Sequence, residues 1–119
     1  MVSNSTEIRP LDLHVCTVFH GAIELIGKRW TGAVISVMLQ GATRFCEIRE
    51  AIPGISDRLL TERLKELEDN GIVTRVVTDS RPPQVAYTLT EKGVALGPVL
   101  DTVSAWAADW CGGHGEAAE

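Results

Sequence analysis

Long hydrophobic runs are missing from this 119-residue sequence. No stretch approaches the roughly 18 uninterrupted apolar residues that a membrane-spanning helix needs, so a membrane span is excluded. The amino-terminal residues also lack the order of a signal peptide, in which a basic segment precedes an apolar one. These two absences predict a cytoplasmic protein that has no membrane partner.

Cysteine is scarce and lacks the spacing of a structural framework. The three cysteines, Cys16, Cys46 and Cys111, are far apart, and no Cys-x-x-C pair occurs. This arrangement fits neither a disulfide framework nor a zinc ribbon, so we expect reduced thiols. His14 and His20 flank Cys16 and are of types that suit zinc or copper, but their spacing is not a recognised chelating motif. We therefore predict no metal and no cofactor.

Catalytic motifs are absent as well. The sequence has no glycine-rich phosphate loop, no nucleophile elbow and no His-Glu-x-x-His motif. Its three histidines lie near the two ends, with none between residues 21 and 113. We therefore predict that the protein is not an enzyme.

Positive charge is too scarce to attract DNA to the molecule as a whole, because the formal net charge is −5. The distribution is more informative than the sum. Residues 44–81 hold seven of the 11 lysines and arginines against eight acids, whereas residues 82–119 hold one lysine against five acids. Any basic surface is therefore local, and the last third of the chain is not expected to touch phosphate.

Two amphipathic helices are predicted in the first third of the chain, because apolar residues recur there at i, i+3, i+4 and i+7. The first stripe is Phe19, Ala22, Ile23 and Ile26, and the second is Trp30, Val34, Val37 and Met38. Gly27 and Gly41 follow these stripes and are expected to end the helices.

Two shorter helices follow, with a tight turn between them. Thr43 is the expected N-cap of the first, and Pro53-Gly54 would end it. Ser56 is the expected N-cap of the second, whose inward face consists of Leu60, Leu64 and Leu67. Two short helices at this separation predict a helix-turn-helix at about residues 44–70.

The hydrophobic period then changes from that of helices to that of strands. An alternating pattern and a proline-stiffened turn predict a hairpin, or wing, at about residues 72–89. An apolar stripe predicts a final helix at about residues 91–111. The fold class is therefore α+β, mainly α: a winged helix-turn-helix with additional N- and C-terminal dimerisation helices. The expected organisation is an arm at residues 1–15, a single domain at 16–111 and a tail at 112–119.

The second helix of the predicted helix-turn-helix carries polar side chains opposite its leucines. At about 100° per residue, Arg58, Thr61 and Lys65 point away from the leucine face. From there they can enter the major groove of DNA and reach bases or phosphates. Ser56 and the amides at the helix start are a natural seat for a phosphate. This helix is therefore the predicted reader of DNA.

Three further arginines are candidates for contacts outside that helix. Arg81, on the predicted hairpin tip, is placed to reach a minor groove or the DNA backbone. Arg44 and Arg49, on the preceding helix, are candidates for positioning contacts to phosphate. The pattern of charges leaves a simpler interpretation open, in which Arg58, Glu62, Lys65 and Glu66 only form i,i+4 ion pairs on a solvated face.

The two terminal helices carry more apolar surface than a domain of this size can easily bury. Trp106 and Trp110 lie one turn apart, and aromatic residues are common at protein interfaces. We expect a homodimer, since a two-fold protein matches two DNA half-sites about one helical turn apart. Packing of the stripe within one chain is the open alternative. The candidate interface residues are Phe19, Ile23, Val103, Trp106 and Trp110.

Several short sequence blocks lie at roughly residues 16–106. Each block alone is weak evidence for a protein family, but their combination is specific. They are Cys16-Thr17-Val18, Glu24-Leu25-Ile26-Gly27-Lys28-Arg29-Trp30, Arg44-Phe45-x-Glu47-Ile48, Ile52-Pro53-Gly54-Ile55-Ser56, Leu60-Thr61, Leu64-Lys65-x-Leu67-Glu68, Gly71 and Pro82-Pro83-x-Val85-x-Tyr87-x-Leu89-Thr90-x-x-Gly93. With these blocks the chain resembles the HxlR-type regulators of bacteria and archaea. It departs from the family pattern at Thr17, usually proline, and at Gln84 and Ala86, usually a basic residue and a glutamate.

The resemblance implies a homodimeric transcriptional regulator that binds a palindromic operator, and we expect a repressor. It also implies that the N- and C-terminal helices build the dimer. In some members a cysteine near the amino terminus senses oxidants or electrophiles, and Cys16 occupies that position. The expected partners are double-stranded DNA and a second copy of the chain, with an oxidant or small molecule as an effector.

Two alternatives to this function stay open. One is a winged helix module used only for protein contacts, which the overall acidity favours. The other is a regulator that responds to a metal or small molecule without thiol sensing.

Overall fold

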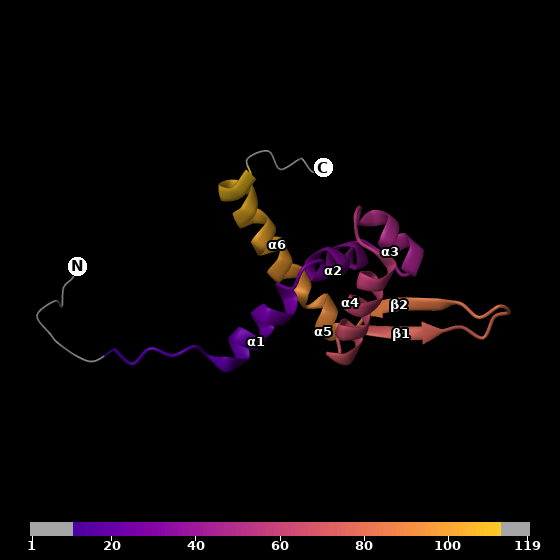
Figure 1. The fold of residues 1–119 in the computed structure, drawn as a ribbon, viewed down its shortest axis with the longest axis horizontal. Helices are drawn as coiled ribbons and strands as arrows, with labels where there is room; N and C mark the ends of the chain where they lie inside the picture. Colours follow the sequence, from indigo (N-terminus) through magenta and orange to yellow (C-terminus); the bar gives the residue numbers. More distant parts are fainter. Residues whose placement is uncertain (1–10, 113–119) are drawn as a thin grey trace, which may run out of the picture.

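The computed structural model describes residues 11–112 of the chain. Figure 1 shows α2 to α5 gathered around the base of a hairpin, which extends to one side, while α1 and α6 project to the other. The helices and the two-stranded antiparallel sheet in the described residues confirm the predicted fold class. The elements are α1 (Thr17–Ile26), α2 (Thr31–Leu39), α3 (Phe45–Ala51), α4 (Asp57–Asp69), β1 (Val73–Val77), β2 (Val85–Leu89), α5 (Glu91–Val94), α6 (Leu96–Ala107) and the π-helical turn η1 (Ala108–Gly112).

The core lies between α2, α3, α4 and the start of β1. Leu60, Leu64 and Leu67 of α4 are buried, as the sequence predicted. They belong to one hydrophobic cluster with Val34 and Ile35 of α2. Full burial of one such side chain stabilises the fold by roughly 1.5–3 kcal/mol. Three leucines on one side therefore fix α4 against the domain and leave its opposite side in solvent.

The caps of α3 and α4 decide where the helix-turn-helix begins. Ser56 caps α4 as predicted, and its hydroxyl accepts a hydrogen bond of 3.1 Å from the Leu59 amide. The prediction that Thr43 caps α3 was wrong, because Arg44 is the N-cap. The Glu47 carboxylate reaches back and accepts hydrogen bonds of 3.0 Å from the amides of Thr43 and Arg44. Thr43 lies outside the helix.

The position of Thr43 is explained by the hairpin. The Tyr87 amide of β2 donates a 2.8 Å hydrogen bond to the Thr43 carbonyl, so residue 43 pairs with a strand. β1 and β2 pair antiparallel, with Val73 opposite Leu89 and Val77 opposite Val85. Val73 at the base is buried, whereas Val77 is half exposed. The hairpin thus projects from the core as a wing.

The predicted helix at residues 91–111 is divided into α5, α6 and η1. Thr90 caps α5, since its hydroxyl accepts a 3.1 Å hydrogen bond from the Gly93 amide. The break at Ala95 is explained by Pro98, which has no amide hydrogen to donate to the carbonyl four residues earlier and whose ring crowds that carbonyl. The terminal stripe therefore changes direction after α5. None of the helices in residues 11–112 has the length and apolar character needed to cross a membrane.

Gly93 is required where α5 approaches the start of β1. A Cβ atom at this position would collide with the backbone oxygen of Ile72 and lie 2.9 Å from Cδ2 of Leu89. Neither neighbour can move freely, because one is backbone and the other belongs to a packed side chain.

We expect Gly93→Ala to lower the free energy of unfolding by about 1–3 kcal/mol, the usual cost of overpacking. Urea denaturation followed by circular dichroism measures it. Gly32→Ala is the matched control, because a Cβ at Gly32 of α2 would meet nothing within 4 Å. Equal losses in both variants would contradict the close approach.

Candidate nucleic-acid interface

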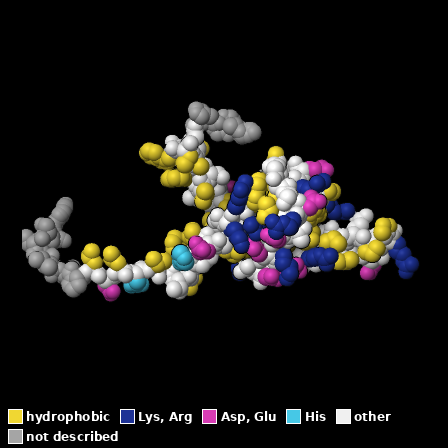
Figure 2. Space-filling view, in the orientation of Figure 1, with side chains coloured by type: hydrophobic (Ala, Val, Ile, Leu, Met, Phe, Trp, Pro, Cys, Tyr) yellow, Lys and Arg dark blue, Asp and Glu magenta, His cyan; other side chains and the backbone are white. Residues whose placement is uncertain are grey.

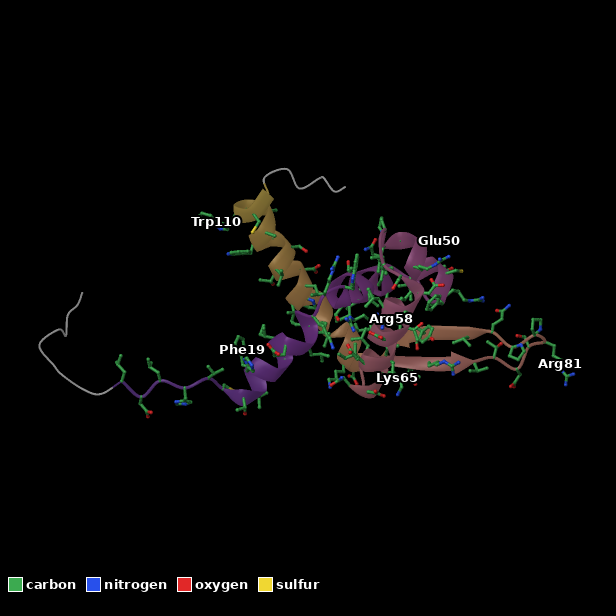
Figure 3. The ribbon with its side chains drawn as sticks, in the orientation of Figure 1. Phe19, Glu50, Arg58, Lys65, Arg81 and Trp110 are labelled. Carbon is green, nitrogen blue, oxygen red and sulfur yellow. The ribbon has the colours of Figure 1, made fainter. Side chains whose placement is uncertain are left out.

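The side of α4 opposite its leucines is exposed and carries Arg58, Thr61 and Lys65. We call these three side chains the recognition face. Figure 3 shows Arg58 and Lys65 along α4. Seven residues of helix separate them, which corresponds to about 10 Å along the axis. That length fits within the major groove of DNA, which is about 12 Å wide.

Each cation of the recognition face is paired with an acid one turn further along α4. Arg58 Nη1 lies 2.8 Å from Glu62 Oε2, and Lys65 Nζ lies 2.9 Å from Asp69 Oδ1. The hydrogen bond to Asp69 raises the pKa of Lys65 above its ordinary value, so the amine is charged at neutral pH. Exposed pairs of this kind are weak, because water screens them. A DNA phosphate can therefore replace the acid as the partner of either cation.

The sequence suggested ion pairing of α4 residues as a simpler interpretation, and the structure contains part of it. Arg58 pairs with Glu62 as that interpretation requires. Lys65 pairs instead with Asp69, and Glu66 pairs with Arg63 of α4 and with Lys28, which precedes α2. Arg58 and Lys65 stay exposed while they form these ion pairs, so the pairing leaves both side chains accessible to DNA.

The neighbouring arginines lie at the start and in the last turn of α3. Arg44, the N-cap of α3, is exposed and has no ion-pair partner among residues 11–112. Arg49 Nη1 lies 3.3 Å from Asp57 Oδ1, which joins the last turn of α3 to the first turn of α4. Next to Arg44, the hydrogen bonds from the Thr43 and Arg44 amides hold the pKa of the Glu47 carboxyl below its ordinary value. Glu47 is thus an anion that organises the start of α3.

The wing carries a second arginine that the sequence analysis missed. Arg81 lies at the far tip of the hairpin, as Figure 3 shows. Arg75 is exposed on β1 and stands opposite Tyr87 in the register. Its position in a predicted strand of the wing was the signal in the sequence that Arg75 is a second cation on the wing. Both wing arginines lack an ion-pair partner in the part of the chain that the structure describes.

Positive charge is local on the surface. In Figure 2, lysine and arginine side chains gather over the region of α3, α4 and the base of the hairpin, with acids between them, and appear again at the hairpin tip. The projecting α1 and α6 show mainly apolar and uncharged atoms in the same view. The cations thus lie on the helix-turn-helix and wing despite the net negative charge.

The five candidate interface residues lie at the opposite end of the molecule. Figure 3 shows Phe19 of α1 and Trp110 of η1 far from Arg81. Phe19 is 62% exposed, Trp106 59% and Trp110 76%, and Ile23 and Val103 are exposed as well. Within residues 11–112, these five side chains are therefore not buried by packing inside one chain. Large exposed apolar surfaces of this kind usually mark an interaction site.

A groove continues this apolar surface between the projecting helices and the body. It has a volume of about 310 Å³ and is apolar apart from Lys92. Phe19 and Ile23 line it from α1, and Leu96 and Val99 line it from α6. The groove joins the apolar sides of α1 and α6 into one surface.

Cys16 is the exposed N-cap of α1, and its carbonyl accepts a 2.9 Å hydrogen bond from the His20 amide. Cys46 and Cys111 are exposed free thiols as well. Within residues 11–112, no group of three or more histidines, cysteines and acids could hold a metal ion. The third histidine of the sequence, His114, lies outside the described range.

The sequence analysis also missed a polar cluster that we call the junction, formed by Lys28, Arg29, Arg63 and Glu66. It joins the connection between α1 and α2 to α4. Arg63 is only 8% exposed, and its Nε donates a 2.9 Å hydrogen bond to the Arg29 carbonyl. Lys28 Nζ lies 2.7 Å from Glu66 Oε2. The spacing of Arg63 beside Leu60, Leu64 and Leu67 was the signal that this arginine faces inward.

An exposed, cation-bearing helix that follows a tight turn, with an arginine-tipped hairpin beside it, defines a winged helix-turn-helix protein of the DNA-binding class. The family model described as HxlR-like helix-turn-helix matches residues 25–114. The chain belongs to this family of transcriptional regulators.

Individual relatives agree with this assignment. The HTH-type transcriptional regulator YodB of Bacillus subtilis is 50% identical over 97 residues, which are 82% of this chain and 87% of YodB. The reduced form of YodB superimposes with a TM-score of 0.76 at 49% identity, over 84% of this chain and 98% of that structure. The redox regulator HypR in its oxidised form gives a TM-score of 0.71 at 39% identity, over 79% and 96%.

Proposed function

We propose that this protein is a sequence-specific repressor that binds a palindromic DNA operator as a homodimer. The recognition face of α4 carries the proposal, because buried leucines hold Arg58, Thr61 and Lys65 outward. The expected site of action is the cytoplasm, without a membrane partner, a cofactor or catalytic activity. A dimer seated on two half-sites would exclude other proteins from the DNA that it covers.

In this proposal, α4 enters the major groove. Arginine can make a bidentate contact with guanine, and the threonine methyl can contact thymine. Lys65 and Ser56 contact phosphate, as do Arg44 and Arg49 beside them. Arg81 follows the backbone or the minor groove from the wing, and Arg75 adds a second cation there.

The acids beside these cations have a role in discrimination. Glu62 and Asp57 hold Arg58 and Arg49 when DNA is absent, and they repel phosphate at any position where the arginines do not reach a partner. The net charge of −5 likewise disfavours binding without sequence preference. Affinity must therefore come from a few well-placed contacts.

We expect Arg58→Ala to weaken binding by about 5- to 150-fold, which corresponds to roughly 1–3 kcal/mol for a good base contact. The probe is DNA that the wild-type protein selects from a random pool, and the measurement is the dissociation constant across a salt series. Lys92→Gln is the control for loss of one cation, because Lys92 lies on α5 and donates to the Asn70 carbonyl.

Two results would count against the proposed DNA binding. A wild-type protein that selects no sequence, and whose binding ignores salt, would favour the protein-contact alternative. Equal weakening by Arg58→Ala and Lys92→Gln would remove the recognition face as the reader of the sequence.

Dimerisation rests on the apolar surface of α1, α6 and η1. We expect Trp106→Ala/Trp110→Ala to convert a dimer into a folded monomer, because truncation of an interface aromatic commonly costs about 2 kcal/mol or more. Both tryptophans are exposed in the single chain, so the fold should persist. Analytical ultracentrifugation gives the mass, and circular dichroism gives the helix content.

Val77→Ala is the control, since Val77 is another exposed apolar residue but lies on the wing. It should leave the dimer intact. A tryptophan double variant that still sediments as a dimer would place the interface elsewhere.

We further propose that Cys16 is the thiol through which an oxidant or electrophile controls DNA binding. Cys16 is exposed and is the N-cap of α1, and an accessible thiol is what an oxidant or electrophile needs. It also sits at one end of the proposed dimer helix. Solved structures of YodB include a diamide-treated and a quinone-bound form, and HypR has reduced and oxidised forms.

Cys16→Ser should bind DNA as wild type does, but should no longer respond to diamide or to benzoquinone. Band-shift assays with and without each reagent measure the response. Cys46→Ser is the control thiol and should respond like the wild type. A Cys16→Ser protein that loses DNA binding on treatment would exclude this sensor and favour a regulator that lacks thiol sensing at this position.

A further inference from the structure

The connection between α1 and α2 links two surfaces that have different proposed tasks. α1 belongs to the apolar dimer surface, and α4 carries the recognition face. Residues 27–30 run from the end of α1 to the N-cap of α2. Contacts that hold this connection in place relative to α4 therefore also set the position of α1 relative to α4.

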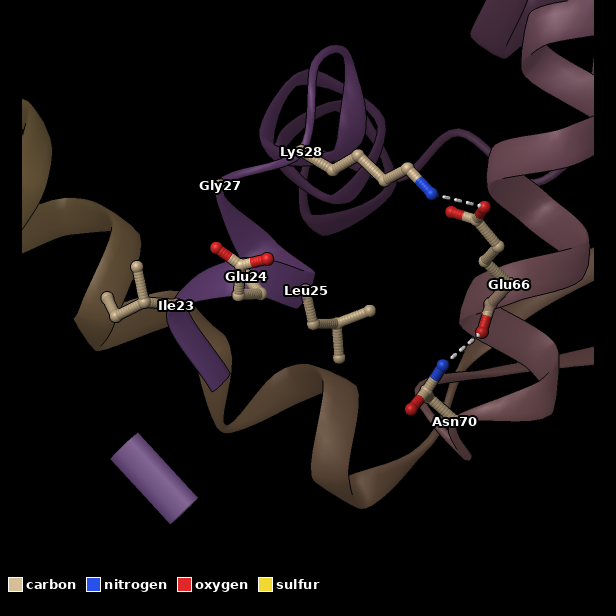
Figure 4. Close-up of a pocket in the computed structure, with 7 residues that line it drawn as sticks. All are labelled: Ile23, Glu24, Leu25, Gly27, Lys28, Glu66 and Asn70. Carbon is tan, nitrogen blue, oxygen red and sulfur yellow. Dashed lines mark hydrogen bonds and ion pairs between the residues drawn. The ribbon is translucent and has the colours of Figure 1, made fainter. Parts of the chain in front are cut away.

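α1 has little other support. It contains no buried residue, and Figure 4 shows an open cavity between its last turn and α4. The cavity has a volume of about 690 Å³ and is lined by Glu24 and Leu25 on one side and by Glu66 and Asn70 on the other. At this point a cavity thus separates α1 from α4, and the half-buried Leu25 packs against the core cluster. The connection adds the constraint that direct packing of α1 on α4 would otherwise supply.

The junction bridges that space with charged hydrogen bonds. Figure 4 shows the Lys28 amine extending to the Glu66 carboxylate, at 2.7 Å. Arg63 Nη1 lies 3.3 Å from both oxygens of the same carboxylate, and Arg63 Nε donates to the Arg29 carbonyl. One carboxylate therefore holds two cations from two segments, and the nearly buried guanidinium needs this partner.

Trp30 fixes the same connection on its other side. A methyl group at Gly54, in the turn of the helix-turn-helix, would lie 3.5 Å from Cη2 of the Trp30 ring, and the Arg29 guanidinium stacks 4.9 Å from the centre of that ring. Trp30 has a φ of 77°, a left-handed conformation that a bulky residue keeps only when its surroundings impose it. The connection is thus held by Arg63 and Glu66 of α4 on one side and contacts the turn before α4 on the other.

The junction residues of α4 do not belong to the recognition face. At about 100° per residue, Arg63 and Glu66 lie on a different side of the helix from Arg58, Thr61 and Lys65. They are thus not placed to contact DNA in the proposed complex, and they act on it only through the position of the helix.

We propose that Lys28, Arg63 and Glu66 are positioning residues that set the separation of the two recognition helices, and so the spacing of the half-sites that the dimer accepts. This inference rests on the proposed homodimeric DNA binding. Half-sites of a dimeric regulator lie about 34–36 Å apart, and each added base pair shifts one half-site by about 3.4 Å and rotates it. If the link between α1 and α4 is rigid, the dimer loses affinity for DNA with such a shift. If the link is loosened, the dimer can adjust to the shift and loses less affinity.

The test uses the palindrome that the full-length wild-type protein selects, together with versions lengthened or shortened at the centre by one or two base pairs. We expect the wild type to lose about tenfold or more in affinity for one added base pair. Glu66→Gln and Lys28→Gln should lose threefold or less, because a looser link lowers the cost of the shift. The measured quantity is the ratio of dissociation constants for altered and original spacing.

Glu68→Gln is the matched control, because it removes one negative charge two residues from Glu66 on an exposed part of α4. It should keep the spacing ratio of the wild type. Lys28→Gln changes an exposed side chain. It therefore tests the same ion pair even if the Glu66→Gln protein fails to fold. A purely structural role would weaken binding to all spacings equally and leave the ratio unchanged.

The outcomes separate this inference from the function on which it rests. If the wild type selects no paired half-sites, the proposed function fails. If the wild type prefers one spacing and the junction variants show the same ratio as Glu68→Gln, the positioning role is overturned. A reduced ratio in both junction variants, together with an unchanged ratio in the control, supports it.

Discussion

Burial of the leucine side of α4 is the interaction on which the other features depend. Leu60, Leu64 and Leu67 enter the cluster formed with α2 and α3, and a helix that is buried on one side over about two turns cannot rotate about its own axis. The residues at the intervening positions therefore have fixed directions. The same burial places the end of α4 beside β1, so the wing begins at a defined position relative to the recognition face.

An acidic protein that binds DNA must place its few cations well. Here the cations of α3 and α4 are held by acids at short range, as in the pairs of Arg49 with Asp57 and Arg58 with Glu62. Such pairs orient the long side chains before DNA arrives, but water screens them enough to permit exchange. The wing arginines have no such partner in the described residues and present their charge directly. Within the described residues, the surface thus combines ion-paired arginines on α3 and α4 with arginines on the wing that have no ion-pair partner.

The molecule separates its charged and apolar surfaces along its length. Cations lie on α3, α4 and the wing, while Phe19, Trp106 and Trp110 are exposed on the projecting helices. This separation permits one surface to contact a second copy while the other contacts DNA. In the proposed homodimer it also creates a mechanical requirement, because a dimer contacts two half-sites together only if its two α4 helices keep a fixed distance. The junction lies where that requirement acts, between the end of α1 and the middle of α4.

The sequence by itself determined the features that depend on near neighbours in the chain. The period of apolar residues predicted the helices and the buried leucines, the Ser56 cap marked the start of α4, and the strand alternation predicted the wing, since each of these signals lies within a few residues. The apolar terminal helices and the exposed recognition face were predicted for the same reason. Short-range signals misplaced the α3 cap, because the Thr43 carbonyl pairs with Tyr87, 44 positions away in the chain. Only the tertiary structure decided that pairing and the junction, where Arg63 meets Arg29 34 residues earlier and Glu66 meets Lys28 38 residues earlier. No local pattern encodes which distant residue a buried charge will meet, because that depends on how the helices pack around the core.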